Sequence, residues 1–182
     1  MNLTSLLSKD RNVLLAITLC SFLLYGLTLN NRYSVDDYLV SEDLEMVNEG
    51  ISGIPEIVTS YYGKTDLGTP YAYRPVTRIT FALERSAWGE RLWLSHLINV
   101  LLYALLSFLV FKLMLLIIGS ENRNLLLIAI GLFVFHPIHT EVVCSLKNRE
   151  EILSLIIVLS SSLLLIKFID TNRWTLLLAA ML

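Results

Sequence analysis

Charged residues are scarce in this sequence. Of its 182 residues only 16% are charged, whereas 55% are hydrophobic, and the mean hydropathy is +0.64. A soluble globular domain carries about 25% charged residues, so the composition excludes an ordinary soluble domain and favours lipid as the solvent. The formal net charge is −2, and the composition gives no indication of a nucleic-acid partner.

Cysteine is scarcer still, with Cys20 and Cys144 as the only two in the sequence. Cys20 lies inside the first apolar run and Cys144 follows a later one, so a bridge between them would have to join different membrane depths. We therefore predict no disulfide. The sequence also lacks internal repeats and low-complexity tracts.

Long apolar segments alternate with polar loops along the chain. The first, residues 13–29, carries no charge and can cross most of a ~30 Å bilayer core. No small-residue cleavage site follows it, so we interpret it as an uncleaved anchor. Further spanning helices are predicted near residues 92–118, 125–138, 152–166 and 175–182. The predicted fold is thus an all-α polytopic membrane protein with about five transmembrane helices and a large first loop, residues 30–91.

The last apolar run opens near Leu176 and reaches Leu182 without a flanking charge or turn. We therefore expect residues 1–182 to be the amino-terminal part of a longer membrane-embedded domain whose last helix here is truncated.

Lysine and arginine in short loops predict the orientation, because such residues concentrate on the cytoplasmic side. They occur before the first helix, after the second and after the fourth, namely at Lys9, Arg11, Arg123, Lys167 and Arg173. The amino terminus is thus expected in the cytoplasm, with loop 30–91 and residues 140–151 on the opposite side. Lys147 and Arg149 run against this rule, and we interpret them as positive charges retained for function.

The first loop contains its own helix signals. Ser41, Glu42 and Asp43 are typical of a helix start that Gly50 can stop, and Pro55 opens a second short helix. Pro75 opens a third helix, on which Arg74, Arg78 and Arg85 would lie near one face. We expect these short helices to lie along the membrane surface.

Asp36 and Asp37 follow the first spanning helix closely, which would hold two carboxylates near the outer membrane surface. A carboxylate there could deprotonate an acceptor hydroxyl or help to bind a metal. A solvated loop or a helix-capping pair is the alternative interpretation.

Arg74 precedes a proline and is therefore held extended between Tyr73 and Pro75. Its guanidinium offers paired donors that suit a phosphate group. The alternatives are an ion pair with an acid of the loop and contact with lipid headgroups.

A second polar cluster runs from His136 to Glu141. The proline between His136 and His139 breaks the helical spacing of a metal-ligand pair, so we assign no metal ligand here. We interpret His139 and Glu141 as the wall of a cavity in which Arg149 contacts an anionic ligand. Tight helix packing is the alternative.

His96 is a further cavity-lining candidate. It would share a helical face with Asn99 and Tyr103, a face expected to point into the bundle. The alternative is a hydrogen-bonded packing residue.

The order of these motifs resembles a known family. Val35-Asp36-Asp37 is followed by Tyr73-Arg74-Pro75-Val76-Thr77 and by Ser95-His96-Leu97-Ile98-Asn99, then by Phe135-His136-Pro137-Ile138-His139-Thr140-Glu141 and Asn148-Arg149-Glu150-Glu151-Ile152-Leu153. This series is similar to the amino-terminal membrane region of the transmembrane O-mannosyltransferases with tetratricopeptide repeats and of their bacterial relatives. These enzymes belong to the type C glycosyltransferase superfamily.

The resemblance implies an inverting transferase that moves a sugar from a polyprenyl-phosphate carrier to a protein or glycan acceptor outside the cytoplasm. Asp36 or Asp37 would then be the catalytic base, and Arg74 and Arg149 would bind the leaving phosphate. No cofactor is assigned, although a divalent metal stays an open alternative. We expect the bacterial inner membrane rather than the endoplasmic reticulum, and we expect residues 1–182 to be inactive alone.

Two other classes of function remain open. One is a non-catalytic membrane scaffold, in which the acids and arginines merely pair with each other. The other is a flippase or transporter for lipid-linked sugars, which would need polar residues spread through its spans. The predicted spans are polar only near their ends, which argues against transport.

Overall fold

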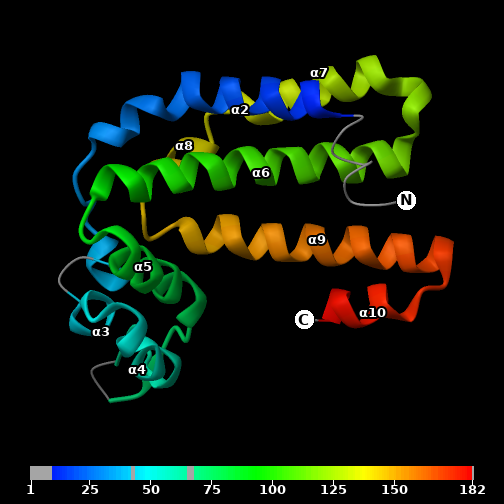
Figure 1. Ribbon diagram of the computed structural model, residues 1–182. Helices are drawn as coiled ribbons and strands as arrows, with labels where there is room; N and C mark the ends of the chain where they lie inside the picture. Colours follow the sequence, from blue (N-terminus) through cyan, green and yellow to red (C-terminus); the bar gives the residue numbers. More distant parts are fainter. Residues whose placement is uncertain (1–9, 42–43, 65–67, 182) are drawn as a thin grey trace. The chain divides into compact units, whose positions relative to one another are not determined.

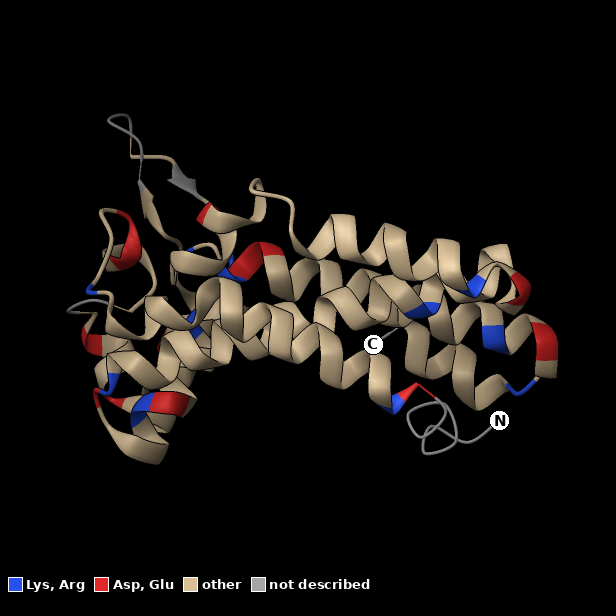
Figure 2. Ribbon diagram, turned by 90° about the horizontal axis from the view of Figure 1, so that it is seen from above, with Lys and Arg blue, Asp and Glu red and all other residues tan. Residues whose placement is uncertain are grey.

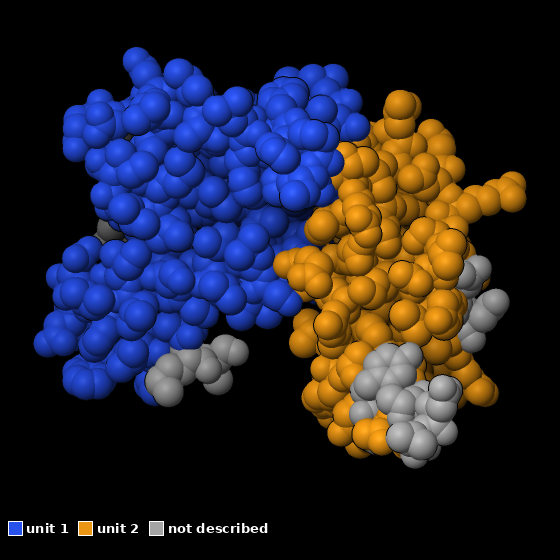
Figure 3. All heavy atoms as spheres, turned by 180° about the vertical axis from the view of Figure 1, so that it is seen from behind, with its two compact units in different colours: residues 1–24, 100–139, 152–182 blue, residues 25–99, 140–151 orange. Residues whose placement is uncertain are grey.

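A computed structural model describes residues 10–41, 44–64 and 68–181 (Figure 1). Nearly all regular structure in these ranges is helical, and the exception is an antiparallel pair of two-residue strands, β1 (Gly63–Lys64) and β2 (Pro70–Tyr71). The predicted all-α fold is confirmed. The chain divides into two compact units, coloured separately in Figure 3: unit 1 comprises residues 1–24, 100–139 and 152–182, and unit 2 comprises residues 25–99 and 140–151.

Long apolar helices supply most of unit 1. They are α2 (Arg11–Tyr25), α6 (Leu92–Ile118), α7 (Arg123–Val134), α9 (Arg149–Thr171) and α10 (Trp174–Met181), and the short η4 (Ser120–Asn122) leads into α7. The first turns of α6 and of α9 belong to unit 2. In unit 1 the Tyr103 hydroxyl of α6 donates a hydrogen bond to the Val134 carbonyl oxygen of α7, over 3.1 Å.

Three helical segments in the described part of the chain are long and apolar enough to span a bilayer: Arg11–Asn30, Leu92–Ile118 and Arg149–Thr171. In Figure 2 the helices of unit 1 are uncharged over most of their length, and their Lys, Arg, Asp and Glu residues gather toward the helix ends. Such helices can satisfy their backbone groups internally in lipid. The protein is an integral membrane protein, while the predicted number of about five spans stays a prediction.

The third apolar run forms a shorter helix than its composition predicts. Helix α7 ends at Val134 instead of near residue 138, and the chain then turns into α8 (His139–Cys144). Pro137 accounts for this end, because it lacks an N–H and disfavours helical backbone in the residue before it.

Unit 2 is built from short helices folded around a small core of their own. They are η1 (Gly26–Asn30), η2 (Asp37–Leu39), α3 (Glu45–Asn48), η3 (Gly50–Gly53), α4 (Ile54–Thr59) and α5 (Pro75–Trp88). The buried core consists of Val40, Val47, Ile57, Phe81, Ala82 and Leu146. Leu146 comes from the segment between α8 and α9, so that segment is part of the core of the first loop.

One of the helix starts predicted for unit 2 agrees with the structure, and another cannot be compared in full. Helix α5 begins at Pro75, as predicted. The predicted start at Ser41 extends over Glu42 and Asp43, which lie outside the described residues, and α3 begins at Glu45.

The three arginines expected on one face of the third helix have different surroundings. Arg78 is buried and donates hydrogen bonds to the carbonyl oxygens of Leu39 and Tyr61, at 2.9 and 3.2 Å. Arg74 occupies the N-cap position of α5, and Arg85 pairs with Glu90. These arginines therefore do not form a common surface.

Candidate functional site

Residues 145–150, which we call the junction segment, comprise the link between α8 and α9 and the first two residues of α9, and they lie entirely in unit 2. Several of the predicted site residues converge on it. Asp37 is fully buried, and its Oδ1 accepts hydrogen bonds from the Lys147 backbone N–H at 2.8 Å and from the Ser145 hydroxyl at 3.3 Å. Its Oδ2 accepts the Ser34 backbone N–H at 2.8 Å. Asp37 therefore ties the start of the first loop to the junction segment.

Asp36 differs sharply from its neighbour. It is exposed and stands as the N-cap residue of η2. Among the described residues its carboxylate has no hydrogen-bond or ion-pair partner. Asp36 is thus a carboxylate open to a ligand and held in place by the buried Asp37 beside it.

Arg149 has no exposed surface in the structure. Its guanidinium pairs with Glu84 and donates hydrogen bonds to the Asn99 side-chain oxygen at 2.7 Å, the Ser95 carbonyl oxygen at 2.9 Å and the Thr80 hydroxyl at 3.0 Å. The guanidinium carbon also lies 3.9 Å from the centre of the Phe81 ring. The charge of Arg149 is therefore engaged inside unit 2, where it holds α5, α6 and α9 together.

Arg74 lies in a more open setting. Its side chain is 49% exposed and pairs with Glu150, which is almost buried. Lys147 also pairs with Glu150, at 2.9 Å, and the Tyr62 hydroxyl donates a hydrogen bond to Glu150 at 3.1 Å. Burial, and then the charge of Glu150, raise the pKa of Tyr62 above 10, so its hydroxyl stays protonated. Two cations around one carboxylate leave a net positive charge at the exposed Arg74.

His96 is fully buried in the first turns of α6, and among the described residues neither of its ring nitrogens has a hydrogen-bond partner. Asn99, one turn further along, donates its side-chain N–H to the carbonyl oxygens of Ser145 at 3.1 Å and Val143 at 3.4 Å. This face of α6 therefore binds the junction segment through Asn99. The His96 ring on the same face has no hydrogen-bond partner within the described chain.

His139 and Glu141 are not drawn into these contacts. His139 belongs to unit 1, where its ring packs on Phe133 and Tyr103 with centroid distances of 4.5 and 5.5 Å. Glu141 is exposed in unit 2. Their assignment as cavity-lining residues stays a prediction.

Cysteine and metal chemistry gain no support at this site. Both cysteines are free, and burial raises the pKa of the Cys144 thiol, which keeps it protonated at neutral pH. No group of at least three His, Cys, Asp or Glu side chains suited to a metal ion occurs in the part of the chain that the structure describes.

Sequence reasoning missed three contributors to the site, Glu84, Glu150 and Tyr62. Glu84 had a usable signal, because it follows Thr77 by seven and Phe81 by three residues and so falls on the buried stripe of α5. A carboxylate on such a stripe needs a buried cation as its partner. Glu150 and Tyr62 carried no comparable signal, since the contacts of Glu150 with Tyr62 and Arg74 join segments far apart in the chain.

Known proteins resemble this chain over part or most of its length. A stretch of 112 residues is 35% identical to protein O-mannosyl-transferase tmtc2 of Xenopus laevis, covering 62% of this chain and 13% of that protein. The human protein O-mannosyl-transferase TMTC2 is 31% identical over 111 residues, 61% of this chain and 13% of that protein. Protein O-mannosyl-transferase Tmtc1 of Drosophila melanogaster is 29% identical over 172 residues, 91% of this chain and 19% of that protein.

These relatives are protein O-mannosyltransferases of the type C superfamily, so the resemblance predicted from the motifs is confirmed. The chain spans between 13% and 19% of the length of the three relatives. No family model matches the chain, and no solved structure matches it.

Proposed function

We propose that this chain is the amino-terminal part of a glycosyltransferase that moves a sugar from a polyprenyl-phosphate carrier to a protein or glycan acceptor. Transfer would take place on the extracytoplasmic side of the membrane, with inversion at the sugar carbon. The bacterial inner membrane stays our expected location. The observation that carries the proposal is that the buried Asp37 and the half-exposed Arg74 both bind one segment, residues 145–150, and that the exposed Asp36 adjoins Asp37 in the chain.

Asp36 is the better candidate for the catalytic base. A general base must reach the acceptor hydroxyl, and Asp36 is exposed whereas Asp37 is fully buried. Both Asp37 oxygens already accept hydrogen bonds from protein donors. We therefore assign Asp37 a positioning role, in which it fixes the backbone that presents Asp36.

Arg74 is the better candidate for the leaving phosphate. Its side chain is 49% exposed, and Lys147 shares its partner Glu150, so positive charge is in excess there. Fixed cations of this kind stabilise charge that develops on a leaving group. The donors of Arg149 are engaged by Glu84, Asn99, Ser95 and Thr80, which favours a positioning role for Arg149 over direct phosphate contact.

A non-catalytic scaffold remains the second candidate, because the pairs Arg149–Glu84 and Arg74–Glu150 are ion pairs of the kind that a scaffold would need. The two candidates differ in what happens when the exposed groups alone are changed. A scaffold would lose nothing when Asp36 loses its charge.

The test is sugar transfer in liposomes by the full-length protein, with a polyprenyl-phosphate-linked donor. Asp36→Asn should lower turnover by roughly 10²- to 10⁴-fold, the usual contribution of a general base, with little change in donor binding. Arg74→Lys keeps the charge but loses the two-pronged contact, so transfer should fall while insertion stays normal. Arg85→Lys, at an ion pair with the exposed Glu90, is the matched control and should transfer normally. Normal turnover by both Asp36→Asn and Asp37→Asn would refute the base and favour the scaffold.

A further inference from the structure

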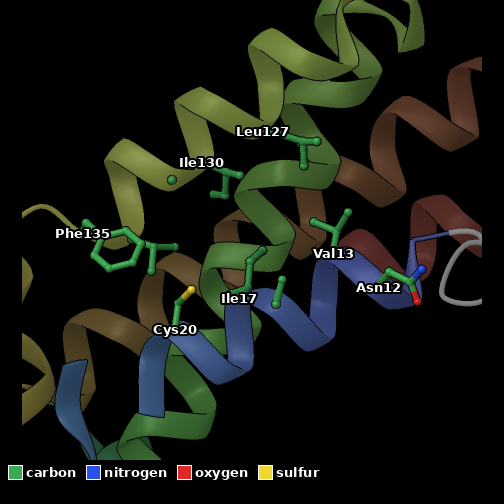
Figure 4. A pocket seen from close by; sticks show the side chains of 10 residues that line it. Asn12, Val13, Ile17, Cys20, Leu127, Ile130 and Phe135 are labelled. Atoms are coloured by element: carbon green, nitrogen blue, oxygen red, sulfur yellow. The ribbon is translucent and has the colours of Figure 1, made fainter. Parts of the chain in front are cut away.

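Unit 1 contains an apolar groove of about 360 Å³ between α2 and α7 (Figure 4). It is lined by Asn12, Val13, Ala16, Ile17, Cys20, Leu127, Ile130, Gly131, Val134 and Phe135. In Figure 4, Asn12 lies at one end of the groove, and Cys20 and Phe135 lie at the other. None of the residues assigned to sugar transfer lines this groove, so a ligand bound there would be distinct from the sugar substrates.

A cluster of charges adjoins the Asn12 end of the groove. The buried Asp10 pairs with Lys112 of α6 at 2.7 Å and with Arg123 of α7 at 2.8 Å. Asn12 follows Asp10 by two residues. Leu127 follows Arg123 by four and therefore shares its helix face. The groove thus runs from a charged end along apolar faces of α2 and α7.

The charged end is positive on balance. Among the described residues, Lys112 and Arg123 both pair with the one carboxylate of Asp10, so this group has two positive charges and one negative charge. Arg123 is 35% exposed and bonds Asp10 through one terminal nitrogen. A guanidinium has five N–H donors, so Arg123 can also bind an anion from outside.

We propose that this groove binds an anionic phospholipid, with one acyl chain between α2 and α7 and the lipid phosphate on Arg123. The apolar lining matches a hydrocarbon chain, and the single excess charge beside its end matches a phosphate. Anionic lipids are enriched in the cytoplasmic leaflet, and the charge rule predicts this end of unit 1 to face the cytoplasm. The proposal does not rest on the sugar-transfer function, because it uses residues of unit 1 alone.

Gly131 offers a position at which a substitution can fill the groove. Gly131 lines the groove, and a Cβ built there meets no side chain or neighbouring element within 4 Å, so a larger side chain can begin there without a clash at its first atom. Gly26 is equally open to a Cβ and lies outside the groove. Gly131→Leu and Gly26→Leu therefore form a matched pair of variant and control.

The experiment is native mass spectrometry of the full chain in detergent, with phosphatidylglycerol or phosphatidylcholine of identical acyl chains added. The wild type should retain phosphatidylglycerol in preference to phosphatidylcholine. Arg123→Gln should weaken phosphatidylglycerol retention by about tenfold, the effect expected from losing a charged hydrogen bond, and so remove the preference. Lys167→Gln, which removes a positive charge after the fourth apolar run, should leave the preference for phosphatidylglycerol unchanged.

Gly131→Leu should reduce retention of both lipids, and Gly26→Leu should reduce neither. Thermal unfolding of each variant shows whether it is folded, and Gly131→Leu serves as the test if Arg123→Gln does not fold. Equal retention of the two lipids by the wild type would overturn the proposal, as would unchanged retention in Gly131→Leu. Preferential displacement of phosphatidylglycerol by a polyprenyl phosphate would identify a carrier site instead and would also overturn it.

Discussion

Asp36 and Asp37 are chemically identical neighbours whose surroundings give them different capacities. The chain buries Asp37 completely and offers it two backbone N–H donors and one hydroxyl. Hydrogen bonds to a buried carboxylate stabilise the folded state and fix its position. The exposed Asp36 keeps its oxygens available to a ligand. We therefore expect Asp37 to give the loop rigidity and Asp36 to carry the proposed chemistry.

Replacing Asp37 should therefore lower stability, and replacing Asp36 should not. In Asp37→Asn, the amide nitrogen of the new side chain must face a backbone N–H donor, Ser34 on one side or Lys147 on the other. We expect a loss of roughly 1–3 kcal/mol in the free energy of unfolding, the cost of an unsatisfied buried donor. Thermal unfolding in detergent measures it, with Asp36→Asn as the matched control. Equal melting temperatures for the two variants would contradict the positioning role.

We expect His139 to make the stability of unit 1 depend on pH. Burial, and then the neighbouring His136, lower the pKa of His139 below its usual 6.5. The unfolded chain then binds more protons than the folded one as the pH falls through about 6.5, so this residue makes stability decline on acidification. His139→Phe preserves ring packing on Phe133 and cannot take up a proton. The melting temperature of this variant should fall less than that of the wild type between about pH 7.5 and pH 5.5. Parallel declines would exclude His139 as a source of the dependence.

At the scale of elements, α3 and α4 are joined through an unusually close approach of the backbone. A Cβ at Gly53 would lie 1.8 Å from the Met46 carbonyl oxygen, so only glycine fits between these helices. Gly50 nearby has a φ of +67°, and a Cβ there would meet the Ser86 side chain of α5 at 2.1 Å. The two glycines thus allow three short helices to share one core.

Gly53→Ala should open this arrangement. The methyl group cannot be accommodated without a backbone shift, so we expect a loss of at least roughly 1–3 kcal/mol, the usual cost of overpacking. Limited proteolysis should then cut within residues 44–64 faster than in the wild type. Gly26→Ala, where the new methyl group meets nothing within 4 Å, is the control and should be cut at the wild-type rate.

Local signals predicted elements better than they predicted partners. The start of α5 at Pro75 follows from the chemistry of a few adjacent residues. The pairing of Arg149 with Glu84 joins positions 65 residues apart, and no local pattern carries such information. The same limit applies to Arg149, because its sequence neighbours do not reveal that residues of α5 and of the first turns of α6 surround its guanidinium.

For the whole molecule, the charge rule predicts that position 38 and position 122 face opposite sides of the membrane. Tyr38 and Asn122 are both exposed, so a cysteine at either position should react with a water-soluble reagent. In a Cys20→Ser, Cys144→Ser background, Tyr38→Cys should label only from the extracytoplasmic side and Asn122→Cys only from the cytoplasm. Detergent-permeabilised membranes supply the control, in which both must label. Labelling of both from one side would overturn the topology.

The contacts of the junction segment also set an order of events during synthesis. Leu146 completes the core of the first loop, Lys147 supplies a partner of Asp37, and Arg149 neutralises Glu84. When only residues 1–138 have been synthesised, the first loop is present but Leu146, Lys147 and Arg149 are not. The loop must therefore wait, incompletely folded, until the start of α9 emerges, and a chaperone or the insertion machinery has that interval in which to hold it.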